Sequence, residues 1–128
     1  MTANVILVLI GLAAALAAIA YIAGNRLQTG SPILVAAFSA GFGAFTTVVI
    51  VYEGILPAWI NHTSNLWGVQ VWWDLLFSIV VALFFVVPRA RAQGMAVPLW
   101  LIFVATTASV GLLAMVARLF WLERRTTA

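Results

Sequence analysis

Four long apolar stretches determine the architecture that this sequence predicts. They cover about residues 4–23, 33–52, 68–87 and 99–122, and the first two contain no charged residue. At a rise of about 1.5 Å per residue, each is long enough to cross the ~30 Å hydrocarbon core of a bilayer as a helix. The pattern predicts an all-α membrane protein, with four transmembrane helices in an up-and-down bundle.

The segments between these spans have the composition of turns and interfaces. Residues 53–67 mix proline, asparagine and histidine with tryptophans, which is typical of a connector lying at the membrane interface. Residues 88–98 form a short basic turn. No internal repeat divides the sequence, so we treat residues 1–128 as one membrane domain.

A cleavable signal peptide is the competing interpretation of the first span. Ala18-Ile19-Ala20 looks like a small-residue cleavage site. A signal peptide carries a basic segment before its apolar stretch, however, and no Lys or Arg precedes Arg26. We therefore expect residues 4–23 to be a membrane span.

The composition supports a membrane protein. Hydrophobic residues make up 66% of the 128 residues and charged residues 7%, whereas soluble domains average roughly 45–50% and 25%. So few charges could not cover the surface of a small soluble domain. The net charge of +3 comes from arginines, which suit phospholipid headgroups better than nucleic acid.

Missing residue types exclude several kinds of chemistry within one chain. Without Cys there is no disulfide exchange, thiolate metal site or iron–sulfur cluster, and without Lys there is no Schiff base. One histidine, His62, cannot supply two axial haem ligands. We predict no enzymatic activity, no metal and no cofactor. A bound lipid, quinone or carotenoid-type pigment would leave almost no signature in such a sequence.

Four crossings would place three ionic residues at the same membrane face. The end of the second span, the start of the third and the end of the fourth carry Glu53, Asp74 and Arg118. An isolated ion inside the membrane edge costs a few kcal/mol, so we predict an Asp74–Arg118 pair with Glu53 as the alternative partner. The cluster is either a coupling site or an ion pair that locks the bundle. The second interpretation is favoured because neither ion lies near the midplane.

The same face gathers polar and aromatic residues around the predicted cluster. They form either a ligand or headgroup pocket or an ordinary interfacial belt of tryptophans. His62 is expected to be a solvated loop residue rather than an axial ligand or proton carrier. The candidate pocket residues are Tyr52, Asn61, His62, Asn65, Trp67, Trp72 and Trp73.

The opposite turns carry Arg26, Arg89 and Arg91, which we expect to contact headgroups and to set the topology. A specific anionic-lipid site is the alternative. Basic residues are nearly balanced between the two faces. Because Arg26 follows an uncharged N-terminus, the positive-inside rule favours both termini outside.

Small residues at helical spacing predict helix contacts, since they let backbones approach closely in lipid. The second span has such a stripe at Ala36, Ala40, Gly43 and Thr47. The fourth has one at Thr107, Gly111, Ala114 and Arg118.

The second half of the chain also carries short motifs. They are Trp73-Asp74-Leu75-Leu76, the basic turn from Arg89 to Gly94-Met95, and the closing Leu122-Glu123-Arg124-Arg125. Over roughly residues 70–125 the chain resembles a family of small uncharacterised bacterial integral membrane proteins, classed as a domain of unknown function. The closing motif departs from the family's Leu-Arg-Glu-Arg-like ending. The resemblance implies a multi-pass protein of the bacterial inner (cytoplasmic) membrane and no activity.

These observations favour a non-enzymatic accessory subunit that packs against a larger membrane complex of respiratory or photosynthetic type. The expected partners are membrane lipids and either that complex or further copies of the chain, and not nucleic acid. The alternative is a small homo-oligomeric transporter or channel using the Asp/Glu/Arg cluster. A lipid-modifying enzyme ranks third, because no motif supports it. The chain is a poor match to small multidrug transporters, because their mechanism depends on a membrane-embedded Glu in the first helix, where this sequence has no acidic residue.

Overall fold

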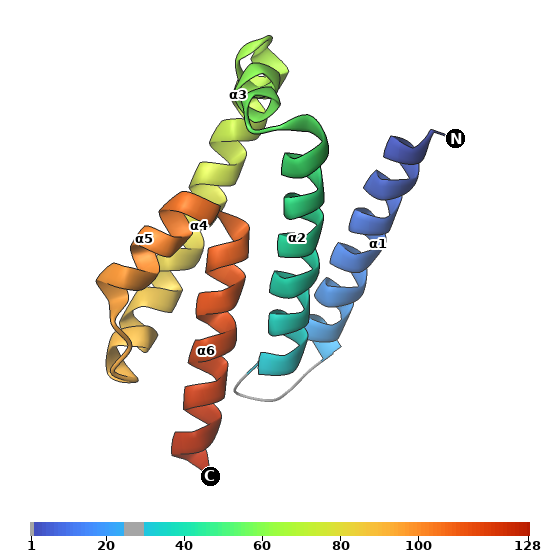
Figure 1. Ribbon diagram of the computed structural model, residues 1–128. Helices are drawn as coiled ribbons and strands as arrows, with labels where there is room; N and C mark the ends of the chain where they lie inside the picture. The colour runs from blue at the N-terminus through green and yellow to red at the C-terminus, as the bar shows by residue number, and fades with distance from the viewer. Residues whose placement is uncertain (1, 25–29) are drawn as a thin grey trace. The chain divides into compact units, whose positions relative to one another are not determined.

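The computed structural model of the chain describes residues 2–24 and 30–128, all of whose regular structure is helical (Figure 1). The chain divides into two units, Met1–Gly30 and Ser31–Ala128. The first contains α1 (Ala3–Gly24). The second contains α2 (Pro32–Glu53), α3 (Leu56–Thr63), α4 (Leu66–Ala92), α5 (Val97–Thr107) and α6 (Ser109–Thr127).

The predicted all-α class is confirmed, and so are three helices of membrane-spanning length. By length and composition α1, α2 and α4 can each cross a bilayer, with 22, 22 and 27 residues. They contain the first three predicted spans. The short helix α3 lies inside the predicted interfacial connector.

Local sequence determines where these helices begin and end. The hydroxyl of Ser31 accepts a hydrogen bond from the Leu34 N–H at 3.3 Å, and Pro32 occupies the first turn of α2. Asn65 caps α4 in the same way, accepting from the Gly68 N–H at 2.8 Å. Gly94, with φ of 70°, follows α4 and provides the turn into α5.

The predicted fourth span, residues 99–122, is not one helix. The chain breaks at Ala108, whose φ of 51° and ψ of −122° end α5 and begin α6. Two hydroxyls just before the break bond back to their own helix, Thr106 to Ile102 O at 3.0 Å and Thr107 to Phe103 O at 2.7 Å. Such bonds tend to bend helices, which is consistent with a break at this position.

Beyond the break the chain reverses. Helices α5 and α6 pack against each other as a hairpin, and α6 runs back toward the end where α4 finishes (Figure 1). An ion pair between Arg89 of α4 and Glu123 of α6 joins these two ends. The tip of the hairpin meets α2 near its midpoint, where a Cβ on Gly43 would lie 3.5 Å from Val110 Cγ1.

The buried core belongs to α4, α5 and α6. Met115 and Leu119 of α6 are its largest fully buried side chains. Gly111 is required where α6 meets α5, because a Cβ there would lie 2.8 Å from the Phe103 carbonyl oxygen and 2.5 Å from Thr107 Oγ1. The core residues are Val86, Ala90, Val97, Val104, Met115 and Leu119.

The predicted small-residue stripes are only partly correct. Gly43 and Gly111 do lie at helix contacts. Ala36, Ala40 and Thr47 are exposed, because the side of α2 that meets α6 is centred on Ser39 and not on the alanines. The Ser39 hydroxyl donates to the Val110 carbonyl oxygen at 3.0 Å.

The Ala108→Gly variant tests the break, because a break and a continuous helix predict opposite changes in the free energy of unfolding. A non-glycine residue at positive φ is strained, so glycine should raise the free energy of unfolding by about 1 kcal/mol. Inside a continuous helix the same change would lower it by about 1 kcal/mol. Reversible unfolding in mixed micelles measures the difference, and a destabilised Ala108→Gly variant would contradict the break.

Candidate functional site

The structure does not assemble the predicted Asp74–Arg118–Glu53 cluster. Asp74 is exposed and has no ion-pair partner among the described residues. It lies about 22 Å along α4 from Arg89, whereas Arg118 lies about 7.5 Å along α6 from Glu123. Because Arg89 and Glu123 are paired, Asp74 and Arg118 are separated by roughly 15 Å along the helix direction. The prediction was wrong because the chain turns back at Ala108 and does not continue to the far end.

Arg118 instead interacts with an aromatic ring on its own helix. Its guanidinium lies 4.4 Å from the centre of the Trp121 ring, and that of Arg125 lies 3.9 Å from the same ring. Such cation–π contacts need no carboxylate partner. Glu53 is exposed at the end of α2, at the opposite end of this unit from these arginines.

His62 belongs to the corner between α3 and α4. Its ring lies 5.1 Å from that of Trp72, and its Nδ1 is 3.3 Å from the Gly68 carbonyl oxygen. Gly68 is needed there, because a Cβ would collide with the backbone oxygen of Asn61. His62 is therefore half-buried and positions the corner, so the expectation of a solvated loop residue was wrong.

The other residues of the predicted pocket lie on the surface around this corner. Tyr52 is 84% exposed and Trp67 76% exposed, and Asn61 and Trp73 are also exposed. Asn65 uses its side chain to cap α4. This arrangement resembles an interfacial belt more than an enclosed ligand pocket.

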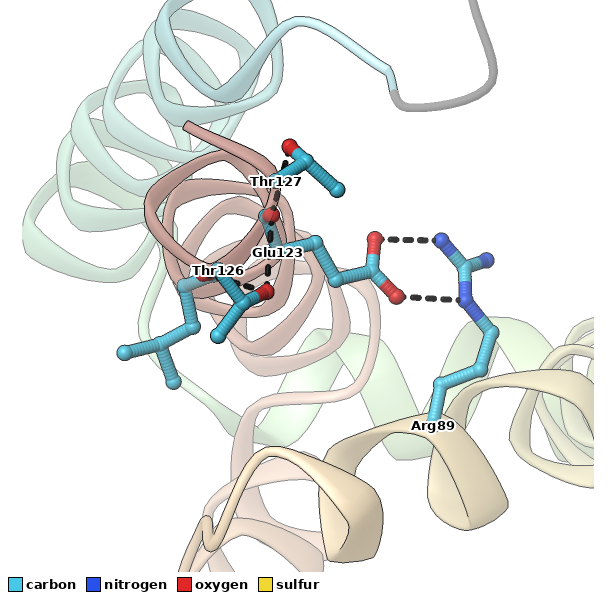
Figure 2. Close-up of polar contacts among 5 residues, drawn as sticks. Arg89, Glu123, Thr126 and Thr127 are labelled. Atoms are coloured by element: carbon cyan, nitrogen blue, oxygen red, sulfur yellow. Dashed lines mark hydrogen bonds and ion pairs between the residues drawn. The ribbon is translucent and has the colours of Figure 1, made fainter.

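The most developed polar contact lies at the other end, which we call the basic end: the last turn of α4, the turn into α5 and the second half of α6. Figure 2 shows that Arg89 donates two parallel hydrogen bonds to the Glu123 carboxylate, from Nε to Oε1 at 2.8 Å and from Nη2 to Oε2 at 2.7 Å. This bidentate geometry is the strongest form of the pair. The Glu123 side chain is only 13% exposed. The pair therefore joins the ends of α4 and α6.

The backbone around Glu123 is reinforced by two threonines. Thr126 and Thr127 donate their hydroxyl protons to the Glu123 carbonyl oxygen at 2.9 and 3.0 Å (Figure 2). Both hydroxyls thus bond back onto the backbone of the last turns of α6. The last turn that carries the carboxylate is stabilised in this way.

An apolar groove opens beside this pair, between α4 and α5. It has a volume of 390 Å³, and Arg91 is the one charged residue on its wall. Arg91 is exposed and forms no ion pair among the residues described, unlike its neighbour Arg89. Arg26, the third arginine predicted to contact headgroups, lies outside the described residues. The groove is lined by Val80, Leu83, Phe84, Val87, Pro88, Arg91 and Leu101.

Sequence reasoning missed both the Glu123 contact and the groove. It placed Glu123 at the opposite face from Arg89, because it counted residues 99–122 as one crossing. The available signal was the single acid of Leu-Glu-Arg-Arg at 122–125, opposite in charge to the arginines of Pro-Arg-Ala-Arg at 88–91. The groove depends on how α5 packs on α4, which no local pattern encodes.

Comparison with known proteins adds no family assignment. No protein-family model matches the chain, and no curated protein or solved structure is significantly similar to it. The resemblance of residues 70–125 to a bacterial membrane family remains a prediction.

A double-mutant cycle of Arg89→Gln and Glu123→Gln tests the ion pair. Because the Arg89 side chain is 43% exposed, solvent weakens the attraction, and we expect a coupling free energy of about 1 kcal/mol. The cycle of Arg91→Gln with Glu123→Gln is the matched control and should show no coupling. Additive effects of Arg89→Gln and Glu123→Gln on the free energy of unfolding would rule out the pair.

Proposed function

We propose that this chain is a small, non-enzymatic integral membrane subunit that packs against a larger membrane complex through α2. The supporting observation is that α2 has a second face, on the side away from α6. One side of α2 meets α6, and the opposite side is exposed and, over residues 36–47, consists of small residues. These residues are Ala36, Ala37, Ala40, Gly41, Ala44 and Thr47.

A small-residue face suits close contact with another helix. In lipid there is no hydrophobic force between helices, so association depends on how closely the backbones can approach. A Cβ on Gly41 would meet no atom of the second unit within 4 Å, so nothing in that unit fills this side of α2. A respiratory or photosynthetic complex is the type of partner that we propose, and self-association would use the same face.

The transporter alternative has less support. Its coupling site was to be Asp74, Glu53 and Arg118, and Arg118 lies roughly 15 Å from Asp74 along the helix direction. A chain with this arrangement would need a second copy to complete an ion-coupling site. An enzyme remains without a supporting motif.

The membrane topology that accompanies this function has three crossings, by α1, α2 and α4, and a hairpin that enters and returns. Helix α5 has 11 residues, or about 16 Å, which is half the ~30 Å hydrocarbon core. Its junction with α6 lies beside Gly43, the midpoint of α2. We therefore place the tip of the hairpin at the bilayer midplane and not at the far surface.

The charges support one orientation of this arrangement. The five arginines in the described part of the chain all lie on α4 beyond its midpoint or on α6, whereas Glu53 and Asp74 lie toward the other end. By the positive-inside rule the basic end faces the cytoplasm. The C-terminus is then inside and the N-terminus outside, which replaces the expectation of two outside termini. The membrane is the bacterial inner membrane, as the resemblance of the second half implies.

Gentle affinity purification of Ala40→Leu tests the docking face. The wild-type chain should retain a stoichiometric set of larger membrane subunits. A leucine in the middle of the small-residue face should lower their recovery about tenfold, since overpacking a contact costs ~1–3 kcal/mol. Quantitative mass spectrometry of the bound proteins gives the ratio.

Ala105→Leu is the matched control, because Ala105 is exposed on α5, outside the small-residue face of α2, and its replacement should leave recovery unchanged. Recovery of the wild-type chain alone, as a monomer or homo-oligomer, would contradict the accessory role. Equal recovery with Ala40→Leu would contradict the docking face.

A further inference from the structure

We propose that the groove between α4 and α5 binds one anionic phospholipid, with an acyl chain along the groove and the phosphate on Arg91. This site is separate from the docking face on α2 and does not depend on it. The shape, the length and the charge of the groove each support such an occupant.

The walls of the groove suit a hydrocarbon chain. Apart from Arg91, every residue that lines it is apolar, and the volume of 390 Å³ lies within the ~300–1,000 Å³ of typical ligand clefts. The Phe84 side chain, at the side of the groove, is 73% exposed. Leu83 and Val87, on the floor of the groove, pack against the core. An apolar occupant would cover ring surface that is otherwise open.

The length of the groove matches one leaflet. Val80 and Arg91 mark its two ends on α4, and their separation of eleven residues corresponds to about 16 Å. Half of the ~30 Å hydrocarbon core is nearly the same distance. On the opposing side the groove is lined by Leu101 of α5. A lipid lying in this groove would therefore place its tail at the midplane and its headgroup beside Arg91.

The charge at the Arg91 end of the groove determines which lipid headgroup binds. Arg89 is already neutralised by Glu123 through two hydrogen bonds. Arg91, two residues further along, has no carboxylate partner among the described residues, and it lies in the last turn of α4. An exposed guanidinium at headgroup height binds a phosphate in bidentate fashion and favours a lipid with net negative charge. A free phosphate would leave the apolar groove empty, so the lipid is the better occupant.

Native mass spectrometry of the full-length protein tests this site. The protein is equilibrated in mild detergent with equal amounts of phosphatidylglycerol and phosphatidylcholine, and the retained lipids are counted. We expect about a fivefold preference for phosphatidylglycerol, as one arginine near a membrane surface contributes ~1 kcal/mol toward an anionic lipid. Arg91→Gln should abolish the preference. Arg124→Gln, the same change at the same end but outside the groove, should keep it.

A second pair of variants tests the groove without changing charge. Val80→Trp fills the groove and should therefore abolish lipid retention. Arg91→Gln, in contrast, should abolish only the preference for phosphatidylglycerol. Val81→Trp is the control, because Val81 is 56% exposed on α4 and does not line the groove. Variants are compared only when their helical content and melting temperature match those of the wild type.

Four results would overturn the proposal. They are equal retention of the two lipids by the wild type, equal losses in Arg91→Gln and Arg124→Gln, unchanged retention in Val80→Trp, and displacement of phosphatidylglycerol by a large excess of inorganic phosphate. The second would indicate diffuse surface charge, and the last a phosphate site without a lipid tail.

Discussion

The reversal of the chain at Ala108 is the constraint on which the rest of the structure depends. Because α6 turns back, Met115 and Leu119 reach the core that α4 and α5 share, and Glu123 comes within bonding distance of Arg89. The same reversal collects the arginines of α4 and α6 at one end and leaves Asp74 far from them. The core, the ion pair, the groove and the proposed orientation all follow from one residue with positive φ.

A break of this kind would be costly in lipid if its backbone were exposed, because hydrocarbon offers no hydrogen bonds. Here the tip is half-buried, and α2 packs on α6 beside it. Ser39 donates to the Val110 carbonyl oxygen, and Gly43 provides close approach at the same height. Gly111 allows α5 and α6 to touch on the other side. The small and hydroxyl residues of the two spans thus cover the tip, and Ser39 bonds directly to its backbone.

The sequence predicted the parts of the fold that depend on length and apolarity. The all-α class and the three long helices come from runs of about 20 apolar residues. The break could not be predicted in the same way, because residues 99–122 are apolar on both sides of it and Thr106-Thr107-Ala108-Ser109 contains neither Gly nor Pro. That single error moved Glu123 to the wrong face and created the expected Asp74–Arg118 pair. Arg91 was a candidate for headgroup contact in the sequence, but the groove beside it required the packing of α5 on α4.

Cysteine accessibility tests the return of the chain most directly, and the protein has no native cysteine to remove. Single cysteines at Gln93, Ala128 and Asn61 would be labelled with a membrane-impermeant maleimide in sealed vesicles of both orientations. The hairpin predicts that Gln93→Cys and Ala128→Cys react from the same side and Asn61→Cys from the other. Labelling of Ala128→Cys from the same side as Asn61→Cys would mean that residues 99–122 cross the membrane, and would contradict the reversal at Ala108.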